Sequence, residues 1–336
     1  MNGKIRLAEG GGGEATASLI RELFWSRFRH PQLLRGNDAA VLEHAGGRLA
    51  LTTDAFVVTP WRFPGGDIGR LAIAGTVNDL TMMGAAALGL TAAFIIEEGF
   101  DKSDLEQIAA SMAAAAAEAG VDLVAGDTKV VRKGEADGIF ITTTGVGTIA
   151  PGVRLGGELA RPGDRVLVTG TLGDHGAAIL LAREELGLSG ALQSDVAPLN
   201  RLLLPLVGEY PGAIRVLRDP TRGGLATTLN EIARQSGVAI RLREAAIPVR
   251  PEVRGLTELL GLDPLYLANE GKALLVVAPE AADAILAALR RQPRGSRAAE
   301  VGEVLAGNAG LVSLVTASGG ERIIPLGSGE QLPRIC

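Results

Sequence analysis

The sequence is poor in cysteine, histidine and aromatic residues. Among 336 residues there are one cysteine and three histidines, and Phe, Trp and Tyr together make up 3%. A single cysteine excludes any disulfide within the chain and is typical of a reducing compartment, so we expect a cytoplasmic protein. The histidines have no HExxH or paired spacing and indicate no zinc site. The low aromatic content also disfavours a surface on which nucleic-acid bases stack.

An excess of positive charge and a long hydrophobic run are also missing. Lysine and arginine total 33 against 38 acidic residues, a net charge of −5, so the chain is unsuited to neutralising a nucleic-acid backbone. The longest uncharged run, residues 80–96, reaches only the lower limit for a membrane-spanning helix and contains two glycines. It predicts instead the end of a helix, a turn at Gly84 and a buried strand. We therefore expect binding neither to nucleic acid nor to a membrane, and the glycine-rich start does not resemble a signal peptide.

The composition permits a large core divided between two domains. Hydrophobic residues make up 47% and charged residues 21%, and the chain length corresponds to about two domains. Helical and strand patterns alternate in both halves, which predicts an α+β fold. A stretch rich in Pro, Gly and Arg at 151–162 marks a boundary. We expect a first domain at 1–155 with a mixed or antiparallel sheet, a second α/β sandwich domain at 156–310, and a flexible tail at 311–336.

Individual elements can be predicted from periodicity and capping signals. Ser103 and Glu106 form a capping box at the start of an alanine-rich helix that Gly120 ends. Helices are also predicted at 176–185, 223–235 and 280–291. Strands are predicted at 49–53, 88–96, 121–125, 139–146, 165–169, 238–242 and 273–278, with two short strand-like runs after residue 310.

Four aspartates lie in sequence contexts unlike those of a solvated surface: Asp38, Asp54, Asp79 and Asp127. They follow or end strand-like runs or lie in glycine-containing turns. Carboxylates in such places can converge on a hard cation, which needs oxygen ligands and bridges nucleotide phosphates. The alternative is four independent turn or cap aspartates, since aspartate is favoured at those positions in any protein.

Two glycine-rich segments, residues 10–13 and 221–224, are weaker candidates for phosphate binding. Glycine lets backbone amides approach a phosphate closely, and a helix N-terminus favours an anion. Neither segment has the spacing of a Walker A motif or a dinucleotide fingerprint. An ordinary loop remains the alternative for both. Among the histidines, His30 and His44 fit an exposed surface, and His175 in the sequence Gly-Asp-His-Gly has either a local loop role or none.

The single cysteine is the last residue, Cys336. A prenylation signal is excluded, because that cysteine must be fourth from the end. The preceding segment contains Gly327 and Gly329, which supply hinge freedom, and Pro333, which stiffens the tip. The thiol could therefore sit on a movable arm.

The C-terminal sequence Pro-Arg-Ile-Cys at 333–336 resembles that of the HypE family, the carbamoyl dehydratases of nickel–iron hydrogenase maturation. Similar motifs recur along nearly the whole chain, and several are shared with aminoimidazole-ribonucleotide and selenophosphate synthetases. They lie at residues 53–58, 64–69, 75–80, 126–131, 173–176, 219–226 and 268–272. The chain departs from the wider superfamily at Asn37, where an aspartate is frequent.

The resemblance implies an aminoimidazole-ribonucleotide synthetase-like fold with an N-terminal ATP-binding domain. It also implies a homodimer in which the N-terminal domains form a shared β-barrel. Cys336 would accept a carbamoyl group from the HypF carbamoyltransferase, ATP would activate the carbamoyl oxygen, and loss of phosphate would leave a thiocyanate. The cyanide would then pass to iron in the HypC–HypD complex.

By the same resemblance, the aspartates would hold Mg²⁺ against the ATP phosphates. Lys129 would stabilise the transferred charge and a base must remove the amide protons, so Lys129 and Glu270 are the candidate catalytic residues beside Cys336. Their alternative is a surface ion pair. The nucleotide-binding residues would be Asp38, Asp54, Asn78, Asp79, Gly126, Asp127 and Thr128.

Two other functions stay open at this point. One is another ATP-dependent activity of the superfamily, a small-molecule kinase or a synthetase. A selenophosphate synthetase would need its reactive cysteine or selenocysteine near the N-terminal glycine run, where this chain has none. The other is a non-catalytic thiol carrier, which would have little use for the aspartates and Lys129.

Overall fold

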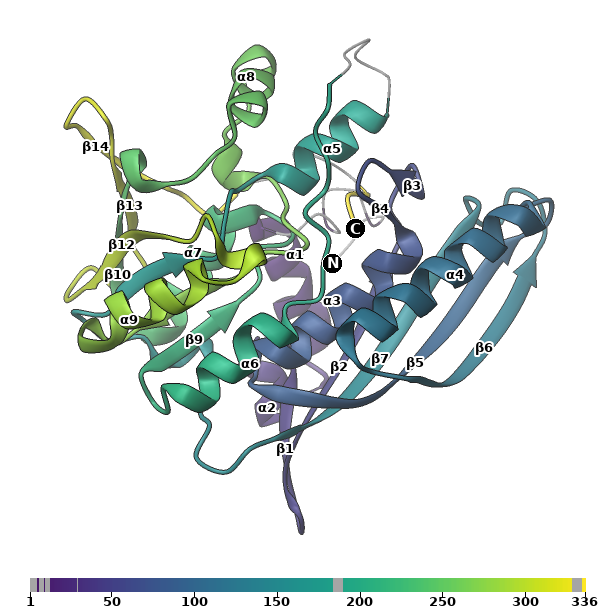
Figure 1. The fold of residues 1–336 in the computed structure, drawn as a ribbon, viewed down its shortest axis with the longest axis horizontal. Helices are drawn as coiled ribbons and strands as arrows, with labels where there is room; N and C mark the ends of the chain where they lie inside the picture. Colours follow the sequence, from purple (N-terminus) through teal and green to yellow (C-terminus); the bar gives the residue numbers. More distant parts are fainter. Residues whose placement is uncertain (1–4, 6–8, 10–12, 29, 184–189, 328–333) are drawn as a thin grey trace.

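The first half of the chain forms a mixed five-stranded sheet. The computed structural model describes residues 5, 9, 13–28, 30–183, 190–327 and 334–336. The strand order is β1-β2-β7-β5-β6, and only β5 and β6 are parallel. The strands are β1 (Ala40–His44), β2 (Gly47–Phe56), β5 (Ala85–Glu97), β6 (Leu123–Val131) and β7 (Ile139–Ile149). The parallel pair needs a crossover, which helix α4 (Lys102–Ala119) supplies (Figure 1).

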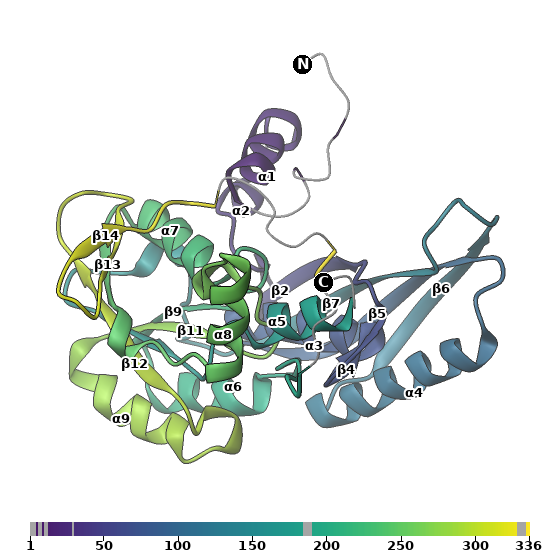
Figure 2. The same cartoon turned by 90° about the horizontal axis from the view of Figure 1, so that it is seen from above.

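Helices α3 (Ile68–Met82) and α4 lie on one face of this sheet (Figures 1 and 2). All residues of α3 except Arg70 and Asp79 are buried, which is why its sequence is apolar on every side. Helix α4 ends at Gly120 with φ of 73°, as predicted. The predicted capping box is wrong, because extended backbone at Asp101 starts the helix earlier and places Ser103 inside its first turn.

The opposite face of the first sheet is open. Alternate residues of β7 are buried against α3. Of the residues between them, Thr142 and Thr148 are exposed and the others are half-buried. On the same open face, the side chains of Leu51 and Ile95 are each 42% exposed. Strand β6 forms the sheet edge and is exposed along nearly its whole length.

The second half forms a seven-stranded sheet in the order β14-β13-β10-β12-β8-β11-β9. Its strands are β8 (Arg165–Val168), β9 (Ile214–Arg218), β10 (Ala239–Arg243), β11 (Leu274–Val277), β12 (Ala299–Leu305), β13 (Val312–Val315) and β14 (Glu321–Ile323). Its helices are α5 (Asp174–Ala182), α6 (Asn200–Glu209), α7 (Gly224–Ser236), α8 (Pro251–Leu260) and α9 (Pro279–Arg290). Because β13 and β14 pair within this sheet, placing the start of the tail at residue 311 is wrong. The predicted C-terminal end of α5 lies outside the described residues.

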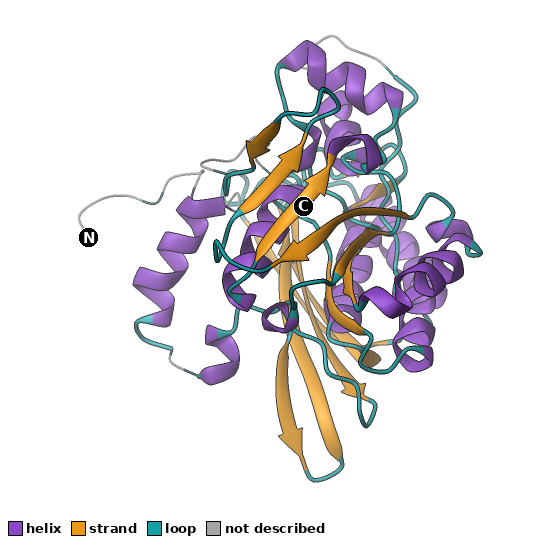
Figure 3. Ribbon diagram, turned by 90° about the vertical axis from the view of Figure 1, so that its left-hand side faces the viewer, coloured by secondary structure: helices purple, strands orange, loops and turns teal. Residues whose placement is uncertain are grey.

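Short elements complete the chain, and Figure 3 distinguishes helices, strands and loops by colour. The hairpin β3 (Arg62–Phe63) and β4 (Gly66–Asp67) connects β2 to α3. Near the N-terminus lie the α-helices α1 (Gly13–Leu19) and α2 (Pro31–Leu34), with the π-helix η2 (Ile20–Trp25) between them. Single 3₁₀ turns are η3 (Gly157–Leu159), η4 (Glu244–Ala246), η5 (Pro264–Tyr266) and η6 (Pro293–Gly295). None of the helices in the described part of the chain combines the length and apolarity needed to cross a membrane.

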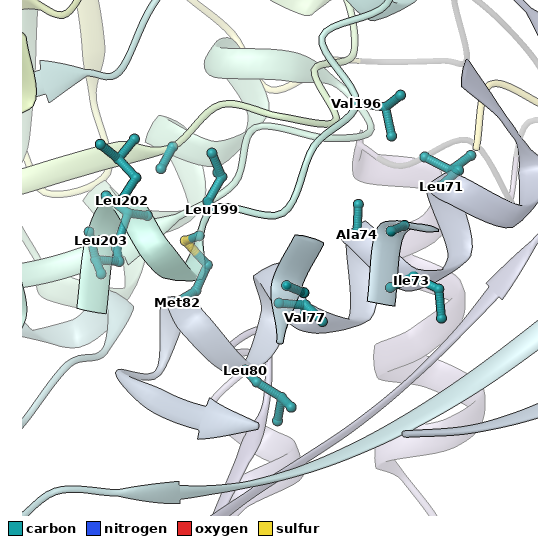
Figure 4. Packing of buried hydrophobic residues seen from close by; sticks show 14 of the residues in the cluster. Leu71, Ile73, Ala74, Val77, Leu80, Met82, Val196, Leu199, Leu202 and Leu203 are labelled. Carbon is teal, nitrogen blue, oxygen red and sulfur yellow. The ribbon is translucent and has the colours of Figure 1, made fainter. Parts of the chain in front are cut away.

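One hydrophobic core joins the two halves. Figure 4 shows Leu71, Ala74, Val77 and Met82 of α3 beside Val196, Leu199, Leu202 and Leu203, which lie in α6 and the segment before it. The same cluster includes Ile335, whose side chain is 4% exposed. The apolar sides of α3 that do not face the first sheet are therefore buried against the second half.

The last residues of the chain return to the end of β2, between the two halves (Figures 1 and 2). The backbone N–H of Val57 donates to the carboxyl-terminal oxygen of Cys336 at 3.0 Å, and that of Thr59 donates to the carbonyl of Arg334 at 3.2 Å. The proposed stiffening at Pro333 and the hinge at Gly329 lie outside the described residues.

Candidate functional site

A cluster of carboxylates lies where the two halves meet. Asp219 and Glu270 are buried, and Asp38, Asp54 and Asp79 are half-buried. Asp38 precedes β1, Asp54 lies on the covered face of β2, and Asp79 belongs to α3. The second half adds Asp219, directly after β9, and Glu270, in the loop before β11. Carboxylates supplied by separate elements of both halves thus share one buried region.

The carboxylates in this cluster raise one another's pKa values. Burial raises the pKa of Asp79 well above its usual value, and the charges of Asp219, Asp54 and Asp38 add to this. Burial is also the largest cause for Asp219, whose pKa rises to about 8, and for Asp38, whose pKa rises to about 6 against the opposing effect of Arg218. Burial and the charges of Asp219 and Asp54 likewise raise the pKa of Glu270.

Two oxygens of the cluster are buried without a hydrogen-bond partner: Asp38 Oδ2 and Glu270 Oε1. Asp79 Oδ2 accepts a hydrogen bond from the Thr52 hydroxyl at 2.7 Å, and Asp54 Oδ1 accepts one from the N–H of Ala55 at 2.8 Å. Buried carboxylates with free lone pairs and raised pKa values favour a bound cation. Within the described residues, however, no three His, Cys, Asp or Glu side chains lie close enough together to hold a metal ion by themselves.

Two arginines, one at the end of β9 and one in the segment after it, supply positive charge to the cluster. Arg218 Nε lies 3.0 Å from Asp38 Oδ1, and its Nη2 donates to Glu231 at 2.8 Å. The pKa of Arg222 is raised first by the charge of Cys336, and then by Asp54 and Glu270 against the effect of burial. Arg222 therefore lies within electrostatic reach of both the C-terminal residue and the carboxylates.

Asn78 and Asp195 hold the loop that carries Glu270. The backbone N–H of Glu270 donates to Asp195 Oδ1 at 3.0 Å, and its carbonyl accepts from Asn78 Nδ2 at 3.4 Å. The same Asn78 amide donates to the carbonyl of Ala197 and accepts from the N–H of Leu199 at 2.8 Å. These three hydrogen bonds join the Asn78 side chain to backbone groups of the second half. They indicate that Asn78 positions Glu270 across the interface between the two halves.

The structure places Asp127 and Lys129 away from the cluster. Both lie on β6, three strands from β2, at about 14 Å for a strand spacing of about 4.8 Å. The registers align Asp127 with Ala93, Thr142 and Ala55, so its side chain is on the open face, whereas Asp54 is on the face covered by α3.

These two side chains form an exposed ion pair. Lys129 Nζ lies 2.7 Å from Asp127 Oδ2, and the side chains are 68% and 65% exposed, respectively. The expected convergence of four aspartates is therefore wrong within one chain, because period-2 alternation directs Asp127 to the other face. Gly126 and Thr128 lie on the same edge strand.

Sequence reasoning missed Asp219, Arg218 and Arg222 as members of the site. Asp219 and Arg222 belong to a motif that carried the family resemblance, and the following Gly223 and Gly224 both have positive φ at the start of α7. The motif at residues 219–226 was the sequence signal that could have identified Asp219 and Arg222. His175 was expected to have a local loop role or none. It lies at the start of α5, is fully buried, and its ring contacts the C-terminal segment. Asn37 bridges to the second half, since its Oδ1 accepts from the N–H of Gly157 at 3.0 Å.

The raised pKa of Asp219 predicts a pH-dependent instability that one substitution relieves. The folded protein holds a proton on Asp219 up to about pH 8, and the unfolded chain releases it near pH 3.9, so stability falls as pH rises between these values. Asp219→Asn mimics the protonated acid. We expect it to match wild type near pH 4 and to be more stable by roughly 1–3 kcal/mol at pH 8.

Urea unfolding at both pH values, with EDTA and no nucleotide, measures this difference. The exposed Glu106→Gln serves as a matched control. A variant that is less stable than wild type at pH 8 would contradict the proposed proton on Asp219.

Comparison with known proteins assigns the family. Two family models match, described as "AIR synthase related protein, N-terminal domain" over residues 36–149 and "AIR synthase related protein, C-terminal domain" over residues 161–314. The chain is 54% identical over 335 residues to "Carbamoyl dehydratase HypE" of Bradyrhizobium diazoefficiens, covering 100% of this chain and 97% of that relative.

Two solved structures are similar over most of their length. A chain of a HypE–HypF complex has 49% identity and a TM-score of 0.88, covering 92% of this chain and 100% of that one. HypE in complex with ATP has 51% identity and a TM-score of 0.83, covering 98% of both chains. These matches confirm the expected aminoimidazole-ribonucleotide synthetase-like α+β fold. The chain belongs to the HypE family of carbamoyl dehydratases.

Proposed function

We propose that this chain uses ATP to dehydrate an S-carbamoyl group on Cys336 to a thiocyanate, which supplies cyanide for hydrogenase iron. The observation that carries the proposal is that the chain end bearing Cys336 docks at the end of the strand that bears Asp54. The backbone contact to Val57 holds it there, and the charge of Cys336 acts on Arg222. The related HypE structure contains ATP, which supports ATP as the co-substrate.

The reaction balances with ATP as the acceptor of the carbamoyl oxygen. That oxygen takes the terminal phosphoryl group of ATP and releases ADP. Loss of the oxygen as phosphate, with removal of both N–H protons, converts S–C(=O)–NH₂ to S–C≡N. Oxygen is a poor leaving group until it is phosphorylated, so positioning and charge neutralisation carry most of the phosphoryl-transfer step.

Glu270 is the candidate base for the amide protons. Its Oε1 is buried without a partner, and its raised pKa makes it a stronger base than an exposed carboxylate. Asn78 and Asp195 fix its backbone, so the carboxyl group is held in the region that Cys336 reaches. Arg222 would stabilise negative charge that develops on the reacting group.

Asp38, Asp54 and Asp79 fit the binding of Mg²⁺ together with nucleotide phosphates. The unpartnered Asp38 Oδ2 and the mutually raised pKa values are the observations that support this fit. A bound Mg²⁺ would neutralise phosphate charge during transfer. Asp219, which belongs to the same cluster, is an additional candidate ligand.

We further propose a homodimer in which a second copy covers the open face of the first sheet. Leu51 and Ile95 are partly exposed there, and β6 is an edge strand. Asp127 and Lys129 lie on this face and cannot reach the cluster of their own chain. The dimer would allow them to contribute to the partner's site, with Asp127 on Mg²⁺ and Lys129 on the transferred charge.

The partners of the thiol follow from its chemistry. Loading requires a carbamoyl donor, which we propose to be the HypF carbamoyltransferase, and a HypE–HypF complex exists for a related chain. We propose the HypC–HypD complex as the acceptor of the cyanide. The ten residues from Gly327 to Cys336 span roughly 33 Å when extended at about 3.3 Å per residue, which is enough to present the thiol outside. A thiol that must stay reduced favours the cytoplasm.

Two single substitutions should affect carbamoyl loading and dehydration separately. We expect Cys336→Ala to lose all carbamoyl loading, because it lacks the acceptor. Glu270→Gln should load normally and accumulate the S-carbamoyl form with dehydration slowed at least about 100-fold, the usual effect of removing a general base. Intact mass after incubation with the carbamoyltransferase, carbamoyl phosphate and ATP distinguishes the free, carbamoylated and dehydrated forms. Loading of Cys336→Ala, or a normal thiocyanate yield from Glu270→Gln, would count against the mechanism.

The carboxylate cluster should govern nucleotide binding. Asp79→Asn keeps an oxygen that can accept the Thr52 hydrogen bond, so we expect the fold to be retained. Loss of one carboxylate from the Mg²⁺ shell should weaken Mg²⁺-dependent ATP binding by roughly 10-fold or more. Isothermal calorimetry with and without Mg²⁺ measures this, and the exposed Glu106→Gln is the control. Unchanged ATP affinity in Asp79→Asn would remove the metal assignment.

The dimer proposal predicts complementation between two inactive variants. Light scattering should give twice the 34.6 kDa chain mass. Lys129→Ala alone should load carbamoyl and fail to dehydrate it. Co-expressed with Cys336→Ala, it should regain activity, because in the mixed dimer the intact Lys129 faces the chain that bears the thiol. A monomeric mass, or no recovery in purified mixed dimers, would show that Lys129 does not act across an interface.

A further inference from the structure

The C-terminal tripeptide is held by four hydrogen bonds to its backbone oxygens. Val57 N–H donates to Cys336 and Thr59 N–H donates to Arg334. The other two donors are side chains of the second half: His175 Nε2 lies 2.7 Å from the carbonyl of Ile335, and Arg183 Nη2 lies 3.0 Å from that of Arg334. The backbone donors would fit any extended segment, whereas the two side chains come from α5 and the residue that follows it.

The hydrogen bonds around His175 select one tautomer. A carbonyl can only accept, so Nε2 carries the proton that is donated to Ile335. Nδ1 then accepts from the Ser194 hydroxyl at 2.8 Å, and Ser194 Oγ in turn accepts from the N–H of Val196 at 3.1 Å. The ring is fully buried and packs edge-on against Phe63 with centroids 5.4 Å apart. Departure of the tripeptide would leave a buried N–H without its partner.

Arg183 joins the tripeptide to the segment after β2. Its Nε donates to the carbonyl of Thr59 at 3.0 Å while Nη2 donates to that of Arg334, so one rigid guanidinium links both segments. Arg334 itself has φ of 52°, a left-handed conformation that costs a non-glycine residue energy. Its Nε donates to the carbonyl of Val57 at 2.9 Å, and its guanidinium pairs with Asp137. These contacts compensate for the unfavourable backbone conformation.

We propose that His175 and Arg183 are positioning residues, which hold the C-terminal tripeptide docked so that the sulfur of Cys336 stays at the carboxylate cluster during dehydration. The inference rests on the proposed function. Within it, neither residue belongs to the nucleotide site or to the reacting groups. Both donate hydrogen bonds to backbone carbonyls, so they can hold the tripeptide whether Cys336 carries a free thiol, an S-carbamoyl group or a thiocyanate. Release for loading and for cyanide transfer requires breaking these same contacts.

Two substitutions of His175 separate its two contacts. Glutamine places its amide nitrogen near the position of Nε2 and can still donate to Ile335. Asparagine is shorter and can serve only the Ser194 side. We expect His175→Asn to weaken docking roughly tenfold, which corresponds to about 1.4 kcal/mol, and so to slow dehydration severalfold. His175→Gln should restore most of the rate. Arg183→Lys should resemble His175→Asn, because an ammonium cannot span Thr59 and Arg334.

The test follows wild type and the three variants by quenched intact mass with carbamoyltransferase, carbamoyl phosphate and ATP. Separate rate constants for loading and for dehydration are fitted to each time course. We expect ATP affinity to be unchanged and loading to be no slower, while the S-carbamoyl form accumulates in His175→Asn and Arg183→Lys. A wild-type dehydration constant in both variants would overturn the proposal. Failure of wild type to form thiocyanate would instead overturn the proposed function.

Docking can be measured without the reaction. The amides of Val57 and Thr59 donate to the tripeptide, so their hydrogen exchange reports its occupancy directly. His175→Asn and Arg183→Lys should each exchange them severalfold faster, because the undocked fraction rises as docking weakens, with Ile141 in the covered face of β7 unchanged as the internal control. Unchanged protection of Val57 and Thr59 would contradict docking by these residues, and faster exchange at Ile141 would assign the variants a general structural defect.

Discussion

The burial of several carboxylates with few compensating cations is the constraint on which the site depends. The cluster contains five carboxylates: Asp38, Asp54, Asp79, Asp219 and Glu270. Among the described residues, the positive charge that opposes them comes from Arg218 and Arg222. Such a cluster is unfavourable for folding alone, because it keeps acids protonated near neutral pH. It becomes favourable when a divalent cation and phosphates supply the missing charge. In the proposed function, binding of the nucleotide offsets this cost to stability.

The shared core makes this crowding possible. Helix α3 packs between the first sheet and α6, which holds Asp79 at the junction of the two halves. Asn78, its neighbour, satisfies its amide with backbone groups of the second half and fixes the Glu270 loop. Packing, interface hydrogen bonds and acid positions are therefore parts of one arrangement. A change in the contact between the two halves would move the base relative to the aspartates.

The C-terminal segment unites the two requirements placed on the thiol. It must be exposed to a partner for loading and buried for dehydration, and a covalent chain end can alternate between these positions. The docked state is held by backbone hydrogen bonds, a buried Ile335 and two side chains of the second half. Each contact is modest in free energy, so their sum can hold the segment without making release slow.

The sequence alone determined the α+β class, the order of most helices and strands, and the special place of Cys336, because periodicity, caps and motifs are local signals. It also identified Asp38, Asp54 and Asp79 as members of one set. Only the tertiary structure decided that Asp127 and Lys129 lie on the opposite face of the sheet, since strand register and the face chosen by α3 depend on long-range pairing. The same holds for Asp219, Arg222 and His175, whose roles arise from contacts between residues far apart in the chain.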